Sequence, residues 1–125
     1  LWLTGPETIE SHIGPKLRKA ASAAGRGEPR IAAGLPIVLT NNVEAARTSI
    51  SESLVIYGQL PSYRAMLDKE GAAGPADVAL IGDEKTLDAG IARLADIGVT
   101  DFSAAISATE DGAAERTLDY LASKL

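Results

Sequence analysis

Cysteine is absent from this sequence of 125 residues, and histidine occurs once, as His12. Disulfides, zinc sites with thiolate ligands, a cysteine nucleophile and metal motifs built on two histidines are therefore excluded. Aromatic residues make up only 4% of the chain, whereas hydrophobic residues make up 46%. We therefore expect a core of small aliphatic side chains on closely packed helices, in a cytoplasmic protein.

Basic residues are outnumbered by acidic ones. Lys and Arg together number 12, Asp and Glu together number 17, and the net charge is −5. This balance argues against binding to a phosphate backbone or to an anionic membrane surface. The longest apolar stretch, residues 31–39, is less than half as long as a membrane span, and residues 1–6 lack the features of a signal peptide. We expect neither a nucleic acid nor a membrane as partner.

Glycine-rich nucleotide motifs are also missing. Neither G-x-G-x-x-G nor G-x-x-x-x-G-K-[ST] occurs, so dinucleotide and P-loop sites have no support.

A complete (β/α)8 barrel needs about 250 residues, so this length allows one domain or part of a larger one. The chain opens without Met on the triplet Leu1–Leu3, which is typical of the end of a strand, and we expect a fragment.

The first predicted helix begins near Pro6. Thr4 and Glu7 have the spacing of a capping box, in which each side chain bonds a backbone amide near the helix start. Apolar residues then recur at helical spacing and predict one buried face: Ile9, Ile13, Leu17, Ala20, Ala21 and Ala24. Pro15 lies inside this pattern and predicts a kink or a break.

Later segments alternate between strands and helices. Residues 30–39 predict a strand buried on both faces, with a bulge or bend at Gly34 and Pro36. Helices are predicted from 43 to 57 and from 61 to 70, followed by a short extended piece at 78–81. Asp83 is expected to cap a helix that ends at Gly98 and packs through Leu87, Ile91 and Leu94, before a strand at 99–106.

Asp111 or Thr109 is expected to cap the last helix, whose inward residues would be Ala114, Leu118, Leu121 and Leu125. This alternation predicts an α/β fold with about three parallel strands and five helices.

Two segments are candidate sites. Thr4, Gly5 and Pro6 follow a predicted strand and open a helix, so their amides could meet an anion at the carboxyl edge of the sheet. Residues 57–64 gather two tyrosines, Gln59 and Arg64 at a helix interruption, which suits either a binding site or packing between helices. His12 is predicted to be a solvated helical residue. The pairs 83–84 and 110–111 are predicted to be helix caps rather than acid–base pairs.

Five runs together resemble the luciferase-like monooxygenase superfamily, and most of all its deazaflavin-dependent oxidoreductases. These runs are WLTGP at 2–6, GLPIV at 34–38, YGQLPSYRAMLD at 57–68, IGDE at 81–84 and LADIGVTDF at 94–102. The resemblance implies the C-terminal part of a (β/α)8 TIM barrel. Residues 1–125 would form one partial domain, from the end of strand six, through strands seven (30–39) and eight (99–106), to helix eight.

The resemblance also implies a function. The full-length protein would transfer a hydride between coenzyme F-420, or alternatively FMN, and an organic substrate. Trp2, Thr4 and Gly5 would lie at the cofactor, and Tyr57, Gln59, Tyr63 and Arg64 would border the substrate entrance. No catalytic residue is identified and no metal is implied.

The fragment alone is expected neither to bind the cofactor nor to be active. It is expected to pair with a second copy or with the missing N-terminal part. The alternative is a non-catalytic α/β module that self-associates.

Overall fold

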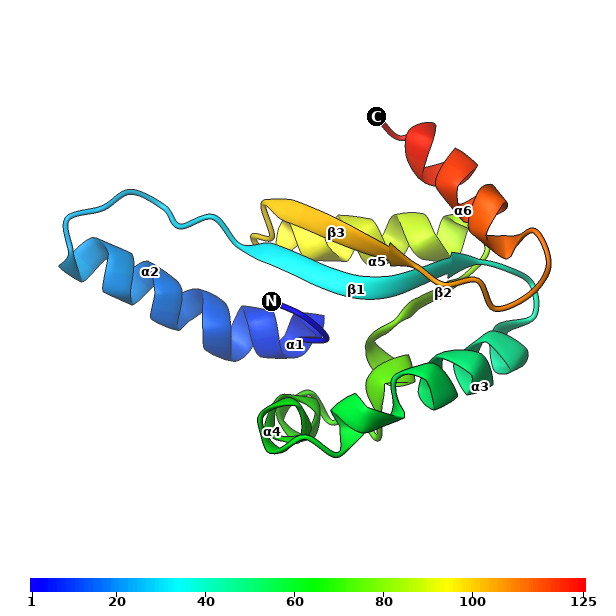
Figure 1. Cartoon of the computed structure of the whole chain (residues 1–125). Coiled ribbons are helices and arrows are strands. Elements are labelled where there is room, and N and C mark those ends of the chain that lie inside the picture. Colours follow the sequence, from blue (N-terminus) through cyan, green and yellow to red (C-terminus); the bar gives the residue numbers. More distant parts are fainter.

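The computed structural model describes all residues, 1–125, and its centre is a three-stranded parallel sheet (Figure 1). The strands are β1 (Ala32–Leu39), β2 (Leu80–Gly82) and β3 (Asp101–Ile106), in the order β2-β1-β3. Residues 1–3 add a short parallel bridge between Trp2 and Gly34 on the β2 side of β1. The predicted α/β fold with three parallel strands is therefore confirmed.

β1 is central because its side chains are apolar on both faces. Six consecutive residues, Ala33 to Val38, are buried. The sequence predicts a bulge or a bend, and the bulge is absent, since β1 pairs with β3 without interruption from Ala32–Asp101 to Ile37–Ile106. Pro36 is tolerated because it faces the other edge, in the gap between the Trp2 bridge and the start of β2 at Leu80. No ladder partner there needs the amide that proline lacks.

The first helical segment runs from Pro6 to Ala23 and changes form twice. It comprises α1 (Pro6–Thr8), a π-helical turn (Ile9–Ile13) and α2 (Gly14–Ala23). The helix is not broken at Pro15. A π turn lies directly before it instead, and its wider winding accommodates the proline ring. The predicted buried face holds only at its start. Ile9 is buried, but α2 extends away from the sheet and leaves Leu17 exposed (Figure 1).

Two helices separate β1 from β2. These are α3 (Val43–Ser53) and α4 (Pro61–Glu70), with 3-10 turns at Val55–Gly58 and Pro75–Val78. α5 (Glu84–Asp96) connects β2 to β3, and the predicted cap is confirmed because the Asp83 carboxylate accepts a hydrogen bond from the Thr86 amide at 2.9 Å.

The last helix, α6 (Ala113–Ala122), differs from its prediction. Its N-cap is Gly112 in a left-handed conformation, rather than Asp111 or Thr109. Its buried residues are Ala113, Thr117 and Tyr120, whereas Leu118 and Leu125 are exposed. Two polar side chains determine this face. The Thr117 hydroxyl bonds the Leu39 amide, and the Tyr120 hydroxyl bonds Asp88 at 2.7 Å.

The two faces of the sheet differ in side-chain size. Ala33, Leu35 and Ile37 point to one face, where they pack in apolar clusters with Ile9 of the π turn and with residues of α4, α5 and α6. The opposite face carries mostly small residues, among them Gly34 and Pro36 of β1 and Ala105 of β3. α3 covers only the carboxyl end of this small-residue face, through Ala46 and Ile50 against Val38.

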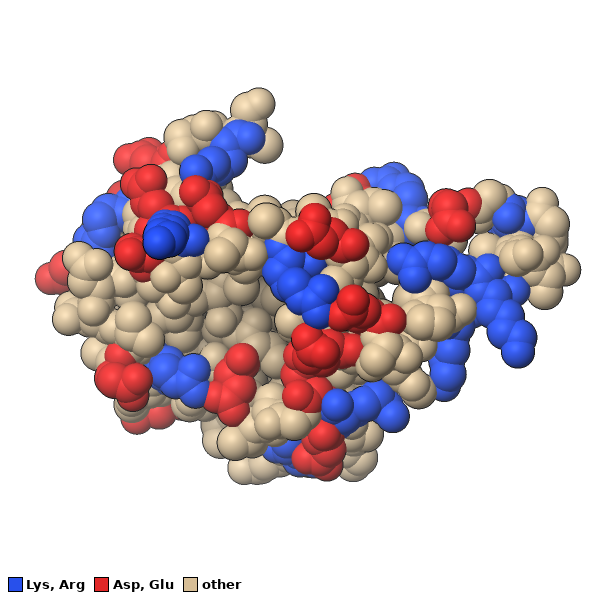
Figure 2. Space-filling view, turned by 180° about the vertical axis from the view of Figure 1, so that it is seen from behind, with Lys and Arg blue, Asp and Glu red and all other residues tan.

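Charge is distributed unevenly over the surface. Figure 2 shows basic side chains gathered at the end of the molecule formed by α2, where Lys16, Arg18, Lys19 and Arg26 occur in sequence. Over the rest of that view, acidic and basic side chains are interspersed. None of the helices combines the length and the apolar character that a membrane crossing requires.

Candidate functional site

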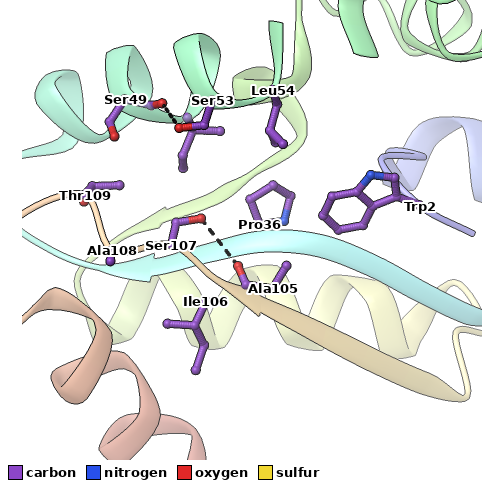
Figure 3. Close-up of a pocket in the computed structure, with 11 residues that line it drawn as sticks. Trp2, Pro36, Ser49, Ser53, Leu54, Ala105, Ile106, Ser107, Ala108 and Thr109 are labelled. Atoms are coloured by element: carbon purple, nitrogen blue, oxygen red, sulfur yellow. Dashed lines mark hydrogen bonds between the residues drawn. The ribbon is translucent and has the colours of Figure 1, made fainter. Parts of the chain in front are cut away.

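A cavity of about 280 Å³ lies on the small-residue face, over Pro36 in the middle of β1, beneath α3 and at the carboxyl end of β3 (Figure 3). This is the edge at which open parallel sheets usually bind ligands. The cavity is lined by Trp2, Pro36, Ser49, Ile50, Ser53, Leu54, Ala105, Ile106, Ser107, Ala108 and Thr109. None of these residues carries a charge, so the cavity is uncharged and is lined by apolar residues and by residues with hydroxyl groups.

Trp2 forms one end wall of the cavity because residues 1–3 pair with β1 at Gly34. The Leu3 amide donates to the Gly34 carbonyl at 3.1 Å, and the Gly34 amide donates to the Leu1 carbonyl at 2.7 Å. Gly34 gives the indole its space, since a Cβ at that position would lie 3.1 Å from Trp2 Cε3. Leu3 has a φ of 53°, a conformation that costs a non-glycine residue about 1 kcal/mol or more. Its side chain is nevertheless fully buried in the core.

Hydroxyl groups line the cavity from two sides. Ser49 and Ser53 lie one turn apart on α3, and the Ser53 hydroxyl donates to the Ser49 carbonyl at 2.8 Å. Ser107 and Thr109 come from the loop after β3, opposite α3 (Figure 3). The Ser107 hydroxyl reaches the Ala105 carbonyl only at 3.5 Å, which is a weak hydrogen bond. These hydroxyls can therefore bond a polar group of a ligand.

The start of α1, which the sequence marks as a possible anion site, holds an anion from the chain itself. The Glu70 carboxylate, at the end of α4, accepts hydrogen bonds from the Glu7 amide (3.1 Å), the Thr8 amide (2.7 Å) and the Thr8 hydroxyl (2.7 Å). The predicted capping box of Thr4 and Glu7 is wrong, because Gly5 is the N-cap and no local side chain caps the helix. Of the three predicted cofactor residues, Trp2 lines the cavity, whereas Thr4 and Gly5 do not.

The four predicted substrate-pocket residues divide into two pairs. Tyr57 packs edge-on against Trp2, with ring centroids 6.2 Å apart, and Tyr63 packs edge-on against Tyr57 at 4.8 Å. Gln59 and Arg64 instead line a separate, open depression of about 470 Å³ between α3 and the 73–77 loop. The Arg64 guanidinium bonds Asp68 at 2.8 Å and the carbonyls of the 72–73 loop. The tyrosines thus support the Trp2 wall, and Arg64 holds a loop.

A polar cluster joins the loops beyond β1 and β3. The Glu110 carboxylate accepts hydrogen bonds from the Asn42 amide group (2.6 Å) and the Thr40 hydroxyl (2.8 Å), and it pairs with Arg116 at 2.6 Å. The hydrogen bonds from Asn42 and Thr40, together with the nearby Arg116, lower the pKa of Glu110. The sequence predicts that Glu110 caps the last helix. The structure shows instead that Glu110 connects two loops.

His12 lies on the first helical segment, with its Nε2 3.1 Å from the Lys16 ammonium. Partial desolvation and the positive charges of Lys16 and Lys69 lower the pKa of His12. It does not line the cavity.

The cavity hydroxyls and Glu70 were not identified from the sequence. Ser49 and Ser53 do carry a signal, since they are spaced four residues apart beside the buried positions Ala46 and Ile50. No local signal marks Glu70, which bonds the start of a helix 62 residues earlier in the chain.

No group of three or more metal-ligating side chains converges anywhere in the structure.

Comparison of the chain with models of protein families, with curated proteins and with solved structures found no match.

Proposed function

We propose that this chain is the C-terminal part of a luciferase-like oxidoreductase, whose full-length form transfers a hydride between coenzyme F-420, or alternatively FMN, and an organic substrate. The observation that carries the proposal is the uncharged cavity at the carboxyl end of β3, beside Pro36 of β1. The five sequence runs add support, because WLTGP supplies the Trp2 wall and GLPIV supplies the Gly34 and Pro36 side of the cavity.

The order of the parallel segments is compatible with part of a (β/α)8 barrel. Residues 1–3 and β3 pair with opposite edges of β1, as consecutive barrel strands would. The π turn, α5 and α6 pack on one face, and small residues occupy most of the other. In such a barrel the small-residue face would line the interior.

The residues fit only one part of a flavin or deazaflavin. Trp2 and Pro36 offer flat apolar surfaces that suit a fused ring. The phosphate-bearing tail finds no matching site, since no cation lines the cavity and the amides at the start of α1 already bond Glu70. When bound, the cofactor ring supplies the hydride. This chain would position the substrate against it and exclude water.

The proposal is tested on the whole gene product that contains this sequence, including any flanking coding sequence. Without oxygen, the oxidation of reduced F-420 or reduced FMN by an uncharged organic hydride acceptor, such as a cyclic enone, is followed by absorbance. Ala105→Leu fills the cavity and Ala32→Leu is the control. Ala32 lies exposed on the same sheet face, outside the cavity. We expect turnover in the wild type and in the control, at least ten-fold slower turnover in Ala105→Leu, and none in the 125-residue chain alone. Binding of neither cofactor by the whole product would overturn the proposal.

A second candidate function is a non-catalytic module that self-associates. It is favoured by open apolar surfaces: the stripe around Leu17 on α2, and the outer edge of β3, where Leu118 of α6 is 57% exposed. Exposed strand edges pair readily with other chains. Light scattering of the 125-residue chain should then give about twice the 12.9 kDa chain mass, and Leu118→Asp should halve that value. A monomeric wild type would exclude this candidate.

A further inference from the structure

The cavity identified above also limits the chemistry of the molecule it can hold. We infer that the organic substrate is uncharged, about the size of a substituted single ring, and bears an oxygen that hydrogen-bonds to serine. That this molecule is a substrate rests on the proposed function. The preference for a neutral ligand depends only on the cavity.

The first step is the absence of charge from the lining. Every lining side chain is apolar or carries a hydroxyl. A charged group that enters such a cavity loses part of its hydration and finds no opposite charge there, which carries a cost in free energy. A neutral molecule avoids this cost, so the cavity discriminates against carboxylates, phosphates and ammonium groups alike.

The second step is the position of the polar atoms. Ser49 projects from α3, and Ser107 lies across from it after β3 (Figure 3). Hydroxyl groups both donate and accept hydrogen bonds. Because the Ser107 hydroxyl has only a weak internal acceptor at 3.5 Å, a ligand oxygen between the two serines would improve its bonding.

The third step is size and shape. A volume of about 280 Å³ is near the lower end of small-molecule sites. The Trp2 indole lies at one end of the lining (Figure 3), and Tyr57 packs edge-on against it. An aromatic or alicyclic ring that lies against Trp2, with its oxygen toward the serines, satisfies both ends.

The chain contains one tryptophan, and that residue is Trp2, so its fluorescence reports occupation of the cavity directly. The 125-residue chain is titrated, without cofactor, with benzyl alcohol, benzoate and benzylammonium, which share a ring and differ in charge. We expect saturable quenching by benzyl alcohol, with a dissociation constant at least ten-fold lower than for either ion. Ala105→Leu should abolish the quenching, and Ala32→Leu should not change it.

Each contrary result overturns the inference. These are equal or tighter binding of an ion, no saturable quenching by benzyl alcohol, or quenching that Ala105→Leu leaves unchanged. Failure of the proposed function is seen separately. A whole gene product that binds neither F-420 nor FMN would remove the hydride chemistry and leave a cavity selective for neutral ligands. Turnover with F-420 and tighter binding of benzoate would remove only the inference.

Discussion

Glu70 stabilises the start of the first helix from a distant part of the chain, and replacing it by alanine should reveal how much stability this contact provides. Its carboxylate accepts three hydrogen bonds, two of them from the amides of Glu7 and Thr8 at the positive end of the helix. Thr8 is fully buried, and both its amide and its hydroxyl depend on this carboxylate for their hydrogen bonds.

The loss can be estimated from its parts. Removal of a helix N-cap costs about 0.5–2 kcal/mol, and loss of a hydrogen bond to a charged group costs about 1.5–3 kcal/mol. Since these contributions overlap, Glu70→Ala should lower the free energy of unfolding by about 2–4 kcal/mol. With an m-value of about 2 kcal/mol per molar urea, the midpoint should fall by about 1–2 M. Glu70→Gln, which keeps one acceptor oxygen, should lose less.

Urea titration followed by Trp2 fluorescence and by circular dichroism measures this change. Glu52→Ala is the matched control, because Glu52 is an exposed helical glutamate without a hydrogen bond or ion pair. Its effect should stay within about 0.5 kcal/mol. If Glu70→Ala destabilises the chain no more than Glu52→Ala does, the assignment of Glu70 as the cap of α1 is refuted.

Three further changes test other parts of the fold. Because the pKa of Glu110 is lowered in the folded state, the Glu110 carboxylate stabilises the fold above pH 4.5, and this stabilisation is lost as the pH falls through the pKa of the folded state. The urea midpoint should therefore drop more on acidification in the wild type than in Glu110→Gln. Gly34→Val should displace the Trp2 ring, red-shift its emission and cost about 1–3 kcal/mol, and an unchanged spectrum would contradict the contact. Asp83→Ala should lower the melting temperature more than Asp83→Asn, because asparagine still accepts from the Thr86 amide; equal losses would contradict the cap.

The elements predicted correctly from the sequence carry strong local signals. The run of apolar residues at 32–39 could only be a buried strand, and Asp83 stands at the position where a carboxylate bonds the first amides of a helix. Pro15 necessarily disturbs the helix, because it lacks an amide and its ring crowds the previous turn. In each case the cause and its effect lie within a few residues.

The predictions that failed concern contacts between distant segments. The buried face of α6 is shifted by one position because the Thr117 hydroxyl reaches the Leu39 amide of β1, a contact 78 residues apart. Helical spacing alone favours Leu118, the more hydrophobic neighbour, which the structure leaves exposed. The cavity was also not predicted as such, because its walls come from residues 1–3, α3 and the loop after β3.

The bond between Glu70 and the start of α1 also has a consequence for protein synthesis. The Thr8 amide leaves the ribosome 62 residues ahead of the carboxylate that it will bond. At about 5–20 residues per second, that interval is about 3–12 s, during which the amides at the helix start are bonded to water alone. The start of the first helix is therefore expected to fray in the nascent chain, and to become stable only when the end of α4 emerges.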